Sequence, residues 1–360
     1  MAAGPGRAKR MLYRCVAVVA SLLVATALGE LLLRLSGRGP WKHLRPRAKE
    51  QMVHDRDPVI GWRTRPGRYH FPPYAPGGEA VEMTFLPDGT RATGLTRPVG
   101  KHRIIFVGGS FTLGWAISDH QTFAWKVQER YPNRGVLNVA VDGYGTYQSL
   151  LALRRYFRRE PGDGSLVVYG FICHHADRNV ATHIWWSGLA YYAGRRPVYL
   201  PYCDLTDDRT HLREHPPRAY PDWPLMRRLA LVNAAADLYA RYLRAGAEQQ
   251  KTRVTRLLIE EMDRLARDNG ARFVVAWLFC LEGRARYRAF FDEKRILVVD
   301  CPLIRGLNYK VPGEGHPNER MNTIWADCIA GGVKKVSGPS PDFTGTGSPR
   351  TSNHSPRSWP

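Results

Sequence analysis

Acidic residues and closely spaced cysteines are scarce in this sequence. Its 360 residues include 32 Asp and Glu against 53 Lys and Arg, a formal net charge of +21. The six cysteines form no Cys-x-x-Cys pair, so the spacing typical of zinc sites is absent. We therefore expect no metal and at most one or two disulfides, whose pairing the spacing leaves open.

The excess of positive charge raises the question of a nucleic-acid partner. The Arg residues are spread over many segments, and the sequence has no zinc-finger spacing, RRM signature or basic helix with heptads. We therefore expect no nucleic-acid partner, and an anionic membrane surface or an acidic glycan suits the same charge. The oligomeric state is not indicated.

Residues 1–35 form a targeting segment. Basic residues precede the apolar run CVAVVASLLVATALG at 15–29, and three leucines follow Glu30. The run is just long enough to span a bilayer, which favours an uncleaved signal-anchor. Small residues at 25–27 instead resemble the cleavage site of a signal peptide, which would make the protein secreted. We expect an anchor, with the remaining chain outside the cytoplasm.

Three segments with different composition follow. Residues 36–100 are rich in Pro, Gly and short alternating pieces, which indicates a β-rich collar. Residues 101–335 form the main domain, with an insertion or lid at about 183–224. Residues 336–360 are rich in Ser, Pro, Gly and Thr, and we expect a disordered tail.

Within the main domain, predicted strands alternate with predicted helices. This alternation argues for an α/β fold with a mainly parallel five-stranded sheet and crossover connections. The expected strands are 103–108, 135–141, 165–171, 271–279 and 296–300. The expected helices lie near 120–130, 146–159, 225–245, 250–268 and 318–330.

A serine lies at a strand-to-helix turn in RIIFVGGSFTLGW, residues 103–115. The apolar run ends at Gly108-Gly109, and Ser110 follows at the start of an expected helix. Such a turn puts a hydroxyl at the carboxyl end of a parallel strand, where α/β sheets bind ligands. Because the backbone N–H groups beyond it are free to bind an anion, Ser110 is a candidate nucleophile.

A serine nucleophile needs a base, and that base works best when a third group holds its tautomer. His316 in VPGEGHPNERMN, residues 311–322, follows the last expected strand by a loop and precedes a helix. A doubly wound sheet brings this loop beside Ser110. We therefore predict that His316 is the base and that Glu314 orients it.

Attack on an ester carbonyl also requires N–H donors for the developing negative charge. The Ser110 amide supplies one donor. The turn DGYG at 142–145 ends another strand, so the Gly143 amide is a second candidate, and Asn179 just past the next strand is a third.

These residues resemble the SGNH (GDSL-like) hydrolase superfamily. Ser110 in GGSFTLGW, Gly143 in NVAVDGYG, Asn179 in HHADRNV and His316 in GEGHPN follow that family's order and spacing over about 101–332. The resemblance implies a flavodoxin-like three-layer α/β/α fold. It also implies Ser110 as nucleophile, His316 as base, and an oxyanion hole from the Ser110 and Gly143 amides with the Asn179 side chain.

Two further segments resemble membrane-tethered bacterial members of that family. They are GELLLRL at 29–35 and DPVIGWRTRPG at 57–67. The resemblance therefore implies a membrane-anchored protein whose catalytic domain lies in a bacterial periplasm or cell envelope.

The sequence differs from the family pattern at three places. Gly109 stands where Asp is usual in Gly-Asp-Ser. Glu314 stands where Asp usually precedes the histidine and is one methylene longer, which leaves open a triad or a Ser-His dyad. The block around Asn179 lacks the usual Gly-x-Asn-Asp form, so Asp177 and Arg178 are further candidates for substrate contact.

Aromatic residues gather in the expected insertion. Trp185, Trp186, Tyr191 and Tyr192 are candidates for a sugar-stacking platform, and packing within a lid is the alternative. Trp185 and Trp186 are included among the candidate substrate contacts.

We therefore expect a serine esterase that hydrolyses carbohydrate or lipid esters, for example O-acetyl groups, through an acyl-serine intermediate and without a cofactor. One alternative is a polysaccharide O-acyltransferase with the same nucleophile. Another is a non-catalytic, membrane-anchored glycan-binding protein on a degenerate hydrolase fold.

Overall fold

A sheet of five parallel strands forms the centre of the computed structural model, which describes residues 5–42, 51–94, 102–193, 196–281 and 283–337. The order across the sheet is β6-β5-β7-β10-β11, so the chain reverses direction between β5 and β7. Ligands bind at such a switch point in open α/β sheets, beyond the carboxyl ends of the strands. The strands are β5 (Arg103–Gly108), β6 (Gly135–Asn138), β7 (Leu166–Ile172), β10 (Arg272–Phe279) and β11 (Val298–Asp300).

The two faces of the sheet bury alternate side chains of each strand. In β5, Ile105 and Val107 pack on one face, and Ile104 and Phe106 pack on the other. Every residue of β7 is buried, as expected for a parallel strand covered by helices on both sides. The expected three-layer α/β fold is therefore confirmed.

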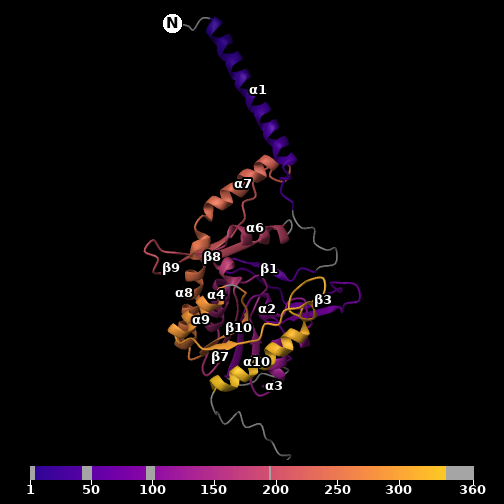
Figure 1. Ribbon diagram of the computed structural model, residues 1–360, viewed down its shortest axis with the longest axis vertical. Coiled ribbons are helices and arrows are strands. Elements are labelled where there is room, and N and C mark those ends of the chain that lie inside the picture. The colour runs from indigo at the N-terminus through magenta and orange to yellow at the C-terminus, as the bar shows by residue number, and fades with distance from the viewer. Residues whose placement is uncertain (1–4, 43–50, 95–101, 194–195, 282, 338–360) are drawn as a thin grey trace, which may run out of the picture.

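Helices cover both faces of the sheet. Helices α4 and α8 pack on the face that buries Ile105, and α3 and α10 lie side by side on the face that buries Ile104 (Figure 1). The helices of the main domain are α2 (Ser110–Leu113), α3 (Phe123–Arg130), α4 (Thr146–Phe157), α5 (His175–Asn179), α6 (His183–Tyr192), α7 (Ala230–Leu243), α8 (Ala247–Asp268), α9 (Arg284–Glu293) and α10 (Glu319–Ser337), with 3₁₀ turns η1 (Asp119–Gln121) and η2 (Leu307–Tyr309).

Short antiparallel hairpins make up the collar and part of the insertion. The hairpins are β1 (His54–Asp57) with β2 (Gly61–Thr64), β3 (Gly67–Phe71) with β4 (Val81–Phe85), and β8 (Tyr199–Leu205) with β9 (Leu212–Ala219). Helix α6 precedes β8 in the insertion, where the sequence indicated no helix. Helix α10 continues through Ser337, two residues into the expected tail, and the rest of that tail lies outside the described residues.

Helix α1 (Pro5–Leu35) projects from the body of the protein (Figure 1). Its window Lys9–Leu35 is long and apolar enough to cross a membrane, and none of that window is buried. Signal sequences near an N-terminus share these properties.

Two disulfides connect elements around the sheet. Cys173 and Cys280 join the segments that follow β7 and β10, and Cys301 and Cys328 join the segment after β11 to α10. Cys203 is a free, buried cysteine. The structure therefore contains two bridges, within the expected limit.

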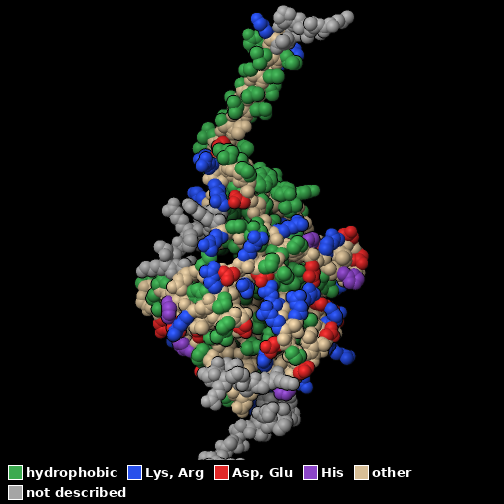
Figure 2. Space-filling model, turned by 180° about the vertical axis from the view of Figure 1, so that it is seen from behind, with side chains coloured by type: hydrophobic (Ala, Val, Ile, Leu, Met, Phe, Trp, Pro, Cys, Tyr) green, Lys and Arg blue, Asp and Glu red, His purple; other side chains and the backbone are tan. Residues whose placement is uncertain are grey.

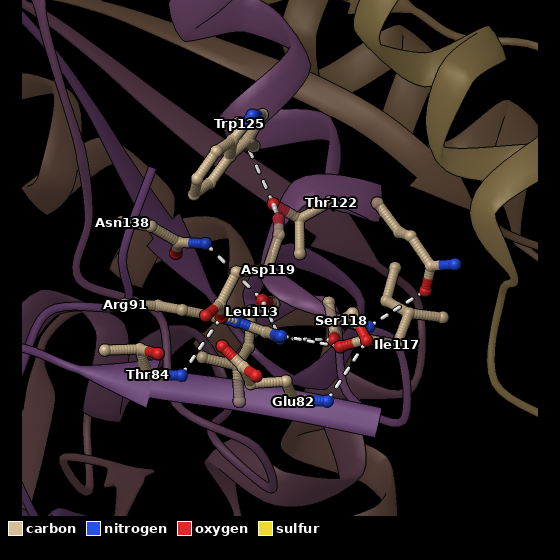
Figure 3. A network of polar contacts seen from close by, with 12 residues as sticks. Glu82, Thr84, Arg91, Leu113, Ile117, Ser118, Asp119, Thr122, Trp125 and Asn138 are labelled. Atoms are coloured by element: carbon tan, nitrogen blue, oxygen red, sulfur yellow. Dashed lines mark hydrogen bonds and ion pairs between the residues drawn. The ribbon is translucent and has the colours of Figure 1, made fainter. Parts of the chain in front are cut away.

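A buried arginine joins the collar to the loop that follows α2 (Figure 3). The Arg91 side chain is completely buried, and its backbone N–H donates to the Asn138 carbonyl beside the sheet. Its guanidinium donates to Asp119 Oδ1 at 3.0 Å. It also donates to the carbonyl oxygen of Leu113, the last residue of α2, and to those of Gly114 and Ile117 in the loop.

Replacing Arg91 by Met is expected to lower the free energy of unfolding by about 3–5 kcal/mol, because it leaves a carboxylate and several carbonyls without their buried donor. Denaturant unfolding measures this loss. The matched control is Arg68→Met, which breaks an exposed ion pair with Glu82 and is expected to cost under about 1 kcal/mol. Equal losses in the two variants would contradict the role assigned to Arg91.

Candidate functional site

The turn after β5 places Ser110 at the carboxyl edge of the sheet. Strand β5 ends at Gly108, and α2 begins at Ser110. The Leu113 N–H donates to the Gly109 carbonyl at 2.9 Å and so forms the single turn of α2. The helix ends at Gly114, which has a φ of +78°. Ser110 is buried and lies at the carboxyl end of β5, where the sequence pattern predicts it.

His316 reaches this serine from a tight loop between η2 and α10. The Val311 N–H donates to the His316 carbonyl at 2.7 Å, and the Asn318 N–H donates to the Tyr309 carbonyl at 3.0 Å. These bonds direct the imidazole toward Ser110, and the His316 Nε2 to Ser110 Oγ distance is 2.9 Å. Two residues separated by 206 positions are thus brought into hydrogen-bond contact.

Glu314 binds the opposite side of the same imidazole. Its Oε1 lies 2.7 Å from His316 Nδ1, and its Oε2 accepts the His316 backbone N–H at 2.8 Å. The side chain folds back because Gly315, between the two residues, has a φ of +97°. A carboxylate beside Nδ1 favours the tautomer with its proton on Nδ1, which leaves Nε2 to accept from the serine hydroxyl.

Two backbone amides that the sequence predicts for the oxyanion have no acceptor among the described residues. They are those of Ser110 and Gly143. Gly143 has a φ of +77°, and a Cβ there would lie 2.9 Å from the ring of Trp62. The Trp62 indole N–H also donates to the Asp142 carbonyl at 3.0 Å, so the collar holds this turn in place.

The Asn179 side chain has a different position from the expected one. Its Nδ2 donates to Thr146 Oγ1 and to Thr255 Oγ1, both at 2.9 Å, and its Oδ1 accepts the Tyr147 N–H at 3.1 Å. Both amide hydrogens are already used, so none remains for an oxyanion. The expected oxyanion role is therefore corrected: Asn179 ties the start of α4 to α8.

Arg178 lies beside the nucleophile turn, from α5. Its Nη1 donates to the Tyr144 carbonyl at 2.8 Å, and its guanidinium lies 4.6 Å from the ring centroid of Trp185. Burial lowers the pKa of Arg178 to about 10, against the opposing effect of Asp142, so the group stays cationic at neutral pH. Its Nε has no hydrogen-bond partner among the described residues.

Gly109 leaves the space that Arg178 occupies. A Cβ at Gly109 would lie 2.8 Å from the Tyr144 carbonyl oxygen and 2.9 Å from both Arg178 Nη1 and His175 Nε2. These distances are shorter than real Cβ contacts, so an Asp at this position would displace its neighbours. The departure from Gly-Asp-Ser therefore has a steric reason in this chain.

The other predicted contact residues lie further from the serine turn. Trp186 is buried and packs edge-on against Tyr220 at 5.4 Å, so it is a core residue rather than the expected substrate contact. Asp177 accepts from Lys251 Nζ at 3.0 Å and so pairs with α8. Tyr192 is exposed at the end of α6.

Sequence reasoning missed the buried contacts of His175. It is fully buried, and its Nδ1 lies 2.7 Å from the Tyr169 hydroxyl, which in turn lies 2.7 Å from Thr146 Oγ1. The other ring nitrogen, Nε2, is buried and has no hydrogen-bond partner among the described residues. Burial lowers the pKa of His175 well below its ordinary value.

A second histidine-carboxylate pair was also missed. His54, from β1, lies with its Nε2 2.6 Å from Asp142 Oδ1, and Asp142 directly precedes Gly143. Burial lowers the pKa of His54, but the Asp142 carboxylate outweighs burial, so the pKa is raised. No sequence motif links these residues, which lie 88 positions apart.

Comparisons with known proteins give structural neighbours only. No family model and no curated protein matches the sequence. A lipolytic G-D-S-L family protein of Veillonella parvula is 12% identical, with a TM-score of 0.36, over 63% of this chain and 96% of that chain. A GDSL-like lipase of Bacteroides thetaiotaomicron is 17% identical, with a TM-score of 0.34, over 67% and 93%.

The His54–Asp142 pair is expected to stabilise the fold most below neutral pH. A raised histidine pKa contributes stability that is fully present below the ordinary value of 6.5 and is lost as the pH rises through the raised pKa. The difference in unfolding free energy between the natural protein and His54→Leu should therefore be larger at about pH 6 than at about pH 9. His70→Leu, at an exposed position of β3, is the control. A difference in unfolding free energy between the natural protein and His54→Leu that does not change with pH would contradict this assignment.

Proposed function

We propose that this chain is a serine esterase of the SGNH type, with Ser110 as nucleophile, His316 as general base and Glu314 as the residue that orients His316. The observation that supports the proposal most directly is the continuous contact Ser110 Oγ, His316 Nε2, His316 Nδ1 and Glu314 Oε1, with distances of 2.9 and 2.7 Å. This contact lies at the carboxyl edge of a parallel sheet beside its switch point, where such sheets bind substrates.

The geometry supports a two-step mechanism. His316 Nε2 takes the Ser110 proton as Oγ attacks the ester carbonyl carbon, and the Ser110 and Gly143 amides stabilise the oxyanion. The tetrahedral adduct collapses, the ester C–O bond breaks, and His316 gives the proton to the departing alcohol. Water then attacks the acyl-serine with the same proton transfers, which releases the acid and restores Ser110.

Glu314 favours the triad over the Ser-His dyad. In a triad, the carboxylate fixes the Nδ1–H tautomer and stabilises the imidazolium that forms during attack. The longer side chain of Glu314 still reaches Nδ1 at 2.7 Å because the loop folds it back over Gly315. The extra methylene is thus compatible with the full triad.

Arg178 supplies a cation beside the site. Its planar group stacks on Trp185, and such a group suits polar or anionic oxygens of a carbohydrate or lipid head group. These two residues are the predicted contacts that remain as candidates for the alcohol part of the substrate. Asp177 pairs with Lys251 of α8 instead, so it is not kept as a candidate substrate contact.

A mainly apolar cavity of about 210 Å³ lies next to the segments that carry the reacting pair. Phe111, which follows Ser110, and Pro317, which follows His316, both line it. Its remaining walls are mainly apolar and suit the acyl chain of an ester better than a sugar. Further lining residues include Phe279, Tyr309, Met321 and Trp325, and two cationic residues, Arg305 and Lys310, also line the cavity.

Location outside the cytoplasm is also part of the proposal. Disulfides persist in oxidising compartments, and this chain has two of them. Helix α1 is apolar enough to direct or anchor the chain at a membrane. Both features support a membrane-anchored enzyme with its active site in the periplasm or cell envelope.

The triad predicts different results for two carboxylate variants. Glu314→Gln should lower kcat by about 10³–10⁴-fold, because an amide no longer favours the Nδ1–H tautomer. Glu319→Gln, the same change on α10 in a residue that pairs with Lys126, should leave kcat almost unchanged. Chromogenic ester hydrolysis measures both, and only a partial loss in Glu314→Gln would favour the dyad.

Ser110 itself is tested by covalent labelling. A fluorophosphonate probe should label the natural protein and fail to label Ser110→Ala. Glycan binding without any labelling of Ser110 would instead indicate a non-catalytic binding protein.

The apolar cavity predicts a preference for acyl chains longer than acetyl. Each methylene buried in the cavity contributes about 0.8 kcal/mol, which raises kcat/KM about fourfold until the cavity is full. A series of chromogenic esters from acetyl to octanoyl measures this, and acetyl as the best substrate would contradict it. Adding an oligosaccharide acceptor distinguishes hydrolysis from transfer, since transfer without release of acid would identify an acyltransferase.

A further inference from the structure

The outward face of α7 is apolar, which reverses the usual pattern of a surface helix. Such a helix normally buries its large apolar residues and shows polar residues to water. Helix α7 buries the small residues Ala236 and Ala240, whereas Leu238 and Tyr242 are 68% and 76% exposed.

Four of the exposed apolar residues of α7 form one stripe along the helix. Leu231, Ala235, Leu238 and Tyr242 have the spacing i, i+4, i+7 and i+11, which places them on one face of a helix, and all four are exposed. We call these four residues the α7 stripe. Continuous exposed apolar surface of this kind marks a site of interaction.

The charged residues of α7 lie off the stripe. Asp237 and Arg241 pair with each other at 2.7 Å. Asp237 also lies 2.6 Å from His183 Nε2 and accepts from Tyr220, so it ties α7 to the body. This side of α7 is therefore the attached side, and the stripe faces away from it.

The end of α1 is fixed to the start of α7. The two carboxylate oxygens of Glu30 accept the N–H groups of Ala230 and Leu231, each at 2.9 Å. Arg34 donates to the Arg228 carbonyl at 2.9 Å. These bonds satisfy N–H groups that a helix start leaves unpaired, so α7 is rigidly placed where the apolar window of α1 ends.

The figures agree with this placement. Helix α7 starts at the lower end of α1 and turns away from its axis, at the end of the body nearest α1 (Figure 1). Hydrophobic side chains gather on the body beneath α1 in the space-filling view (Figure 2). A membrane crossed by α1 would therefore meet this part of the body first.

We propose that the α7 stripe lies in the head-group region of the bilayer that α1 enters, so that the protein rests on the membrane through a second, interfacial helix. Lipid is the occupant to which the observations point, because the stripe adjoins the apolar window of α1. Tyr242 is of a type enriched at membrane interfaces, and Arg34 and Arg241 at its margins suit anionic lipids. Helices of this kind bury their apolar face about 5–10 Å into the boundary.

The test uses the full chain in vesicles of phosphatidylcholine and phosphatidylglycerol brominated high on the acyl chains. A fluorophore is attached to Leu238→Cys or Tyr242→Cys in a Cys15→Ser background. Free Cys203 is buried, and the other cysteines form disulfides, so only the new thiol reacts. We expect strong quenching at both positions.

Two controls make the result decisive. A label on native Cys15 in α1 reports insertion of α1, and a label on Glu129→Cys in α3, at the far end of the body in Figure 1, should stay unquenched. Quenching at Cys15 but at neither α7 position would overturn the proposal, and so would an unquenched Cys15. Efficient disulfide cross-linking between two Leu238→Cys chains, without quenching, would identify a second copy of this chain as the occupant instead.

Discussion

The hydrogen bonds and ion pair of the buried Arg91 guanidinium are the interactions on which the site most depends. Moving a charge out of water costs several kcal/mol unless paired acceptors surround it, and here one carboxylate and three carbonyls do so. The carboxylate belongs to η1, and the three carbonyls belong to the last residue of α2 and to the loop between α2 and η1. The collar, which carries Arg91, is therefore part of the frame that holds Ser110 rather than a separate appendage.

The collar contributes to the opposite wall of the site in the same way. Trp62 and His54 both bind the turn that carries Gly143, one through its indole N–H and the other through Asp142. The proposed oxyanion donors are thus held from outside the sheet. The short hairpins of the collar would be only marginally stable alone, and these polar contacts with the main domain hold them in position.

Local patterns were sufficient to predict the sheet and the Ser110–His316 contact. Buried parallel strands appear as continuous apolar runs, as at 103–108 and 165–171, and Ser110 and His316 both follow strand ends at one edge. The Arg91 network, the His54–Asp142 pair and the true partners of Asn179 were not predictable in this way. They depend on contacts between side chains that lie far apart in the sequence, and no residue spacing indicates such contacts.

The junction between α1 and α7 has a consequence for how the body of this protein can move relative to α1. A domain on a flexible linker can take many orientations relative to its anchor. Here the two hydrogen bonds to the Glu30 carboxylate and the one from Arg34 fix the orientation of α7 relative to α1. With α1 held in a bilayer, the active site would keep a fixed height and heading above it. Substrates would then have to reach the site at that distance from the membrane. A chain shortened to begin after Leu35 would lose the hydrogen bonds from Glu30 and Arg34 that fix the start of α7.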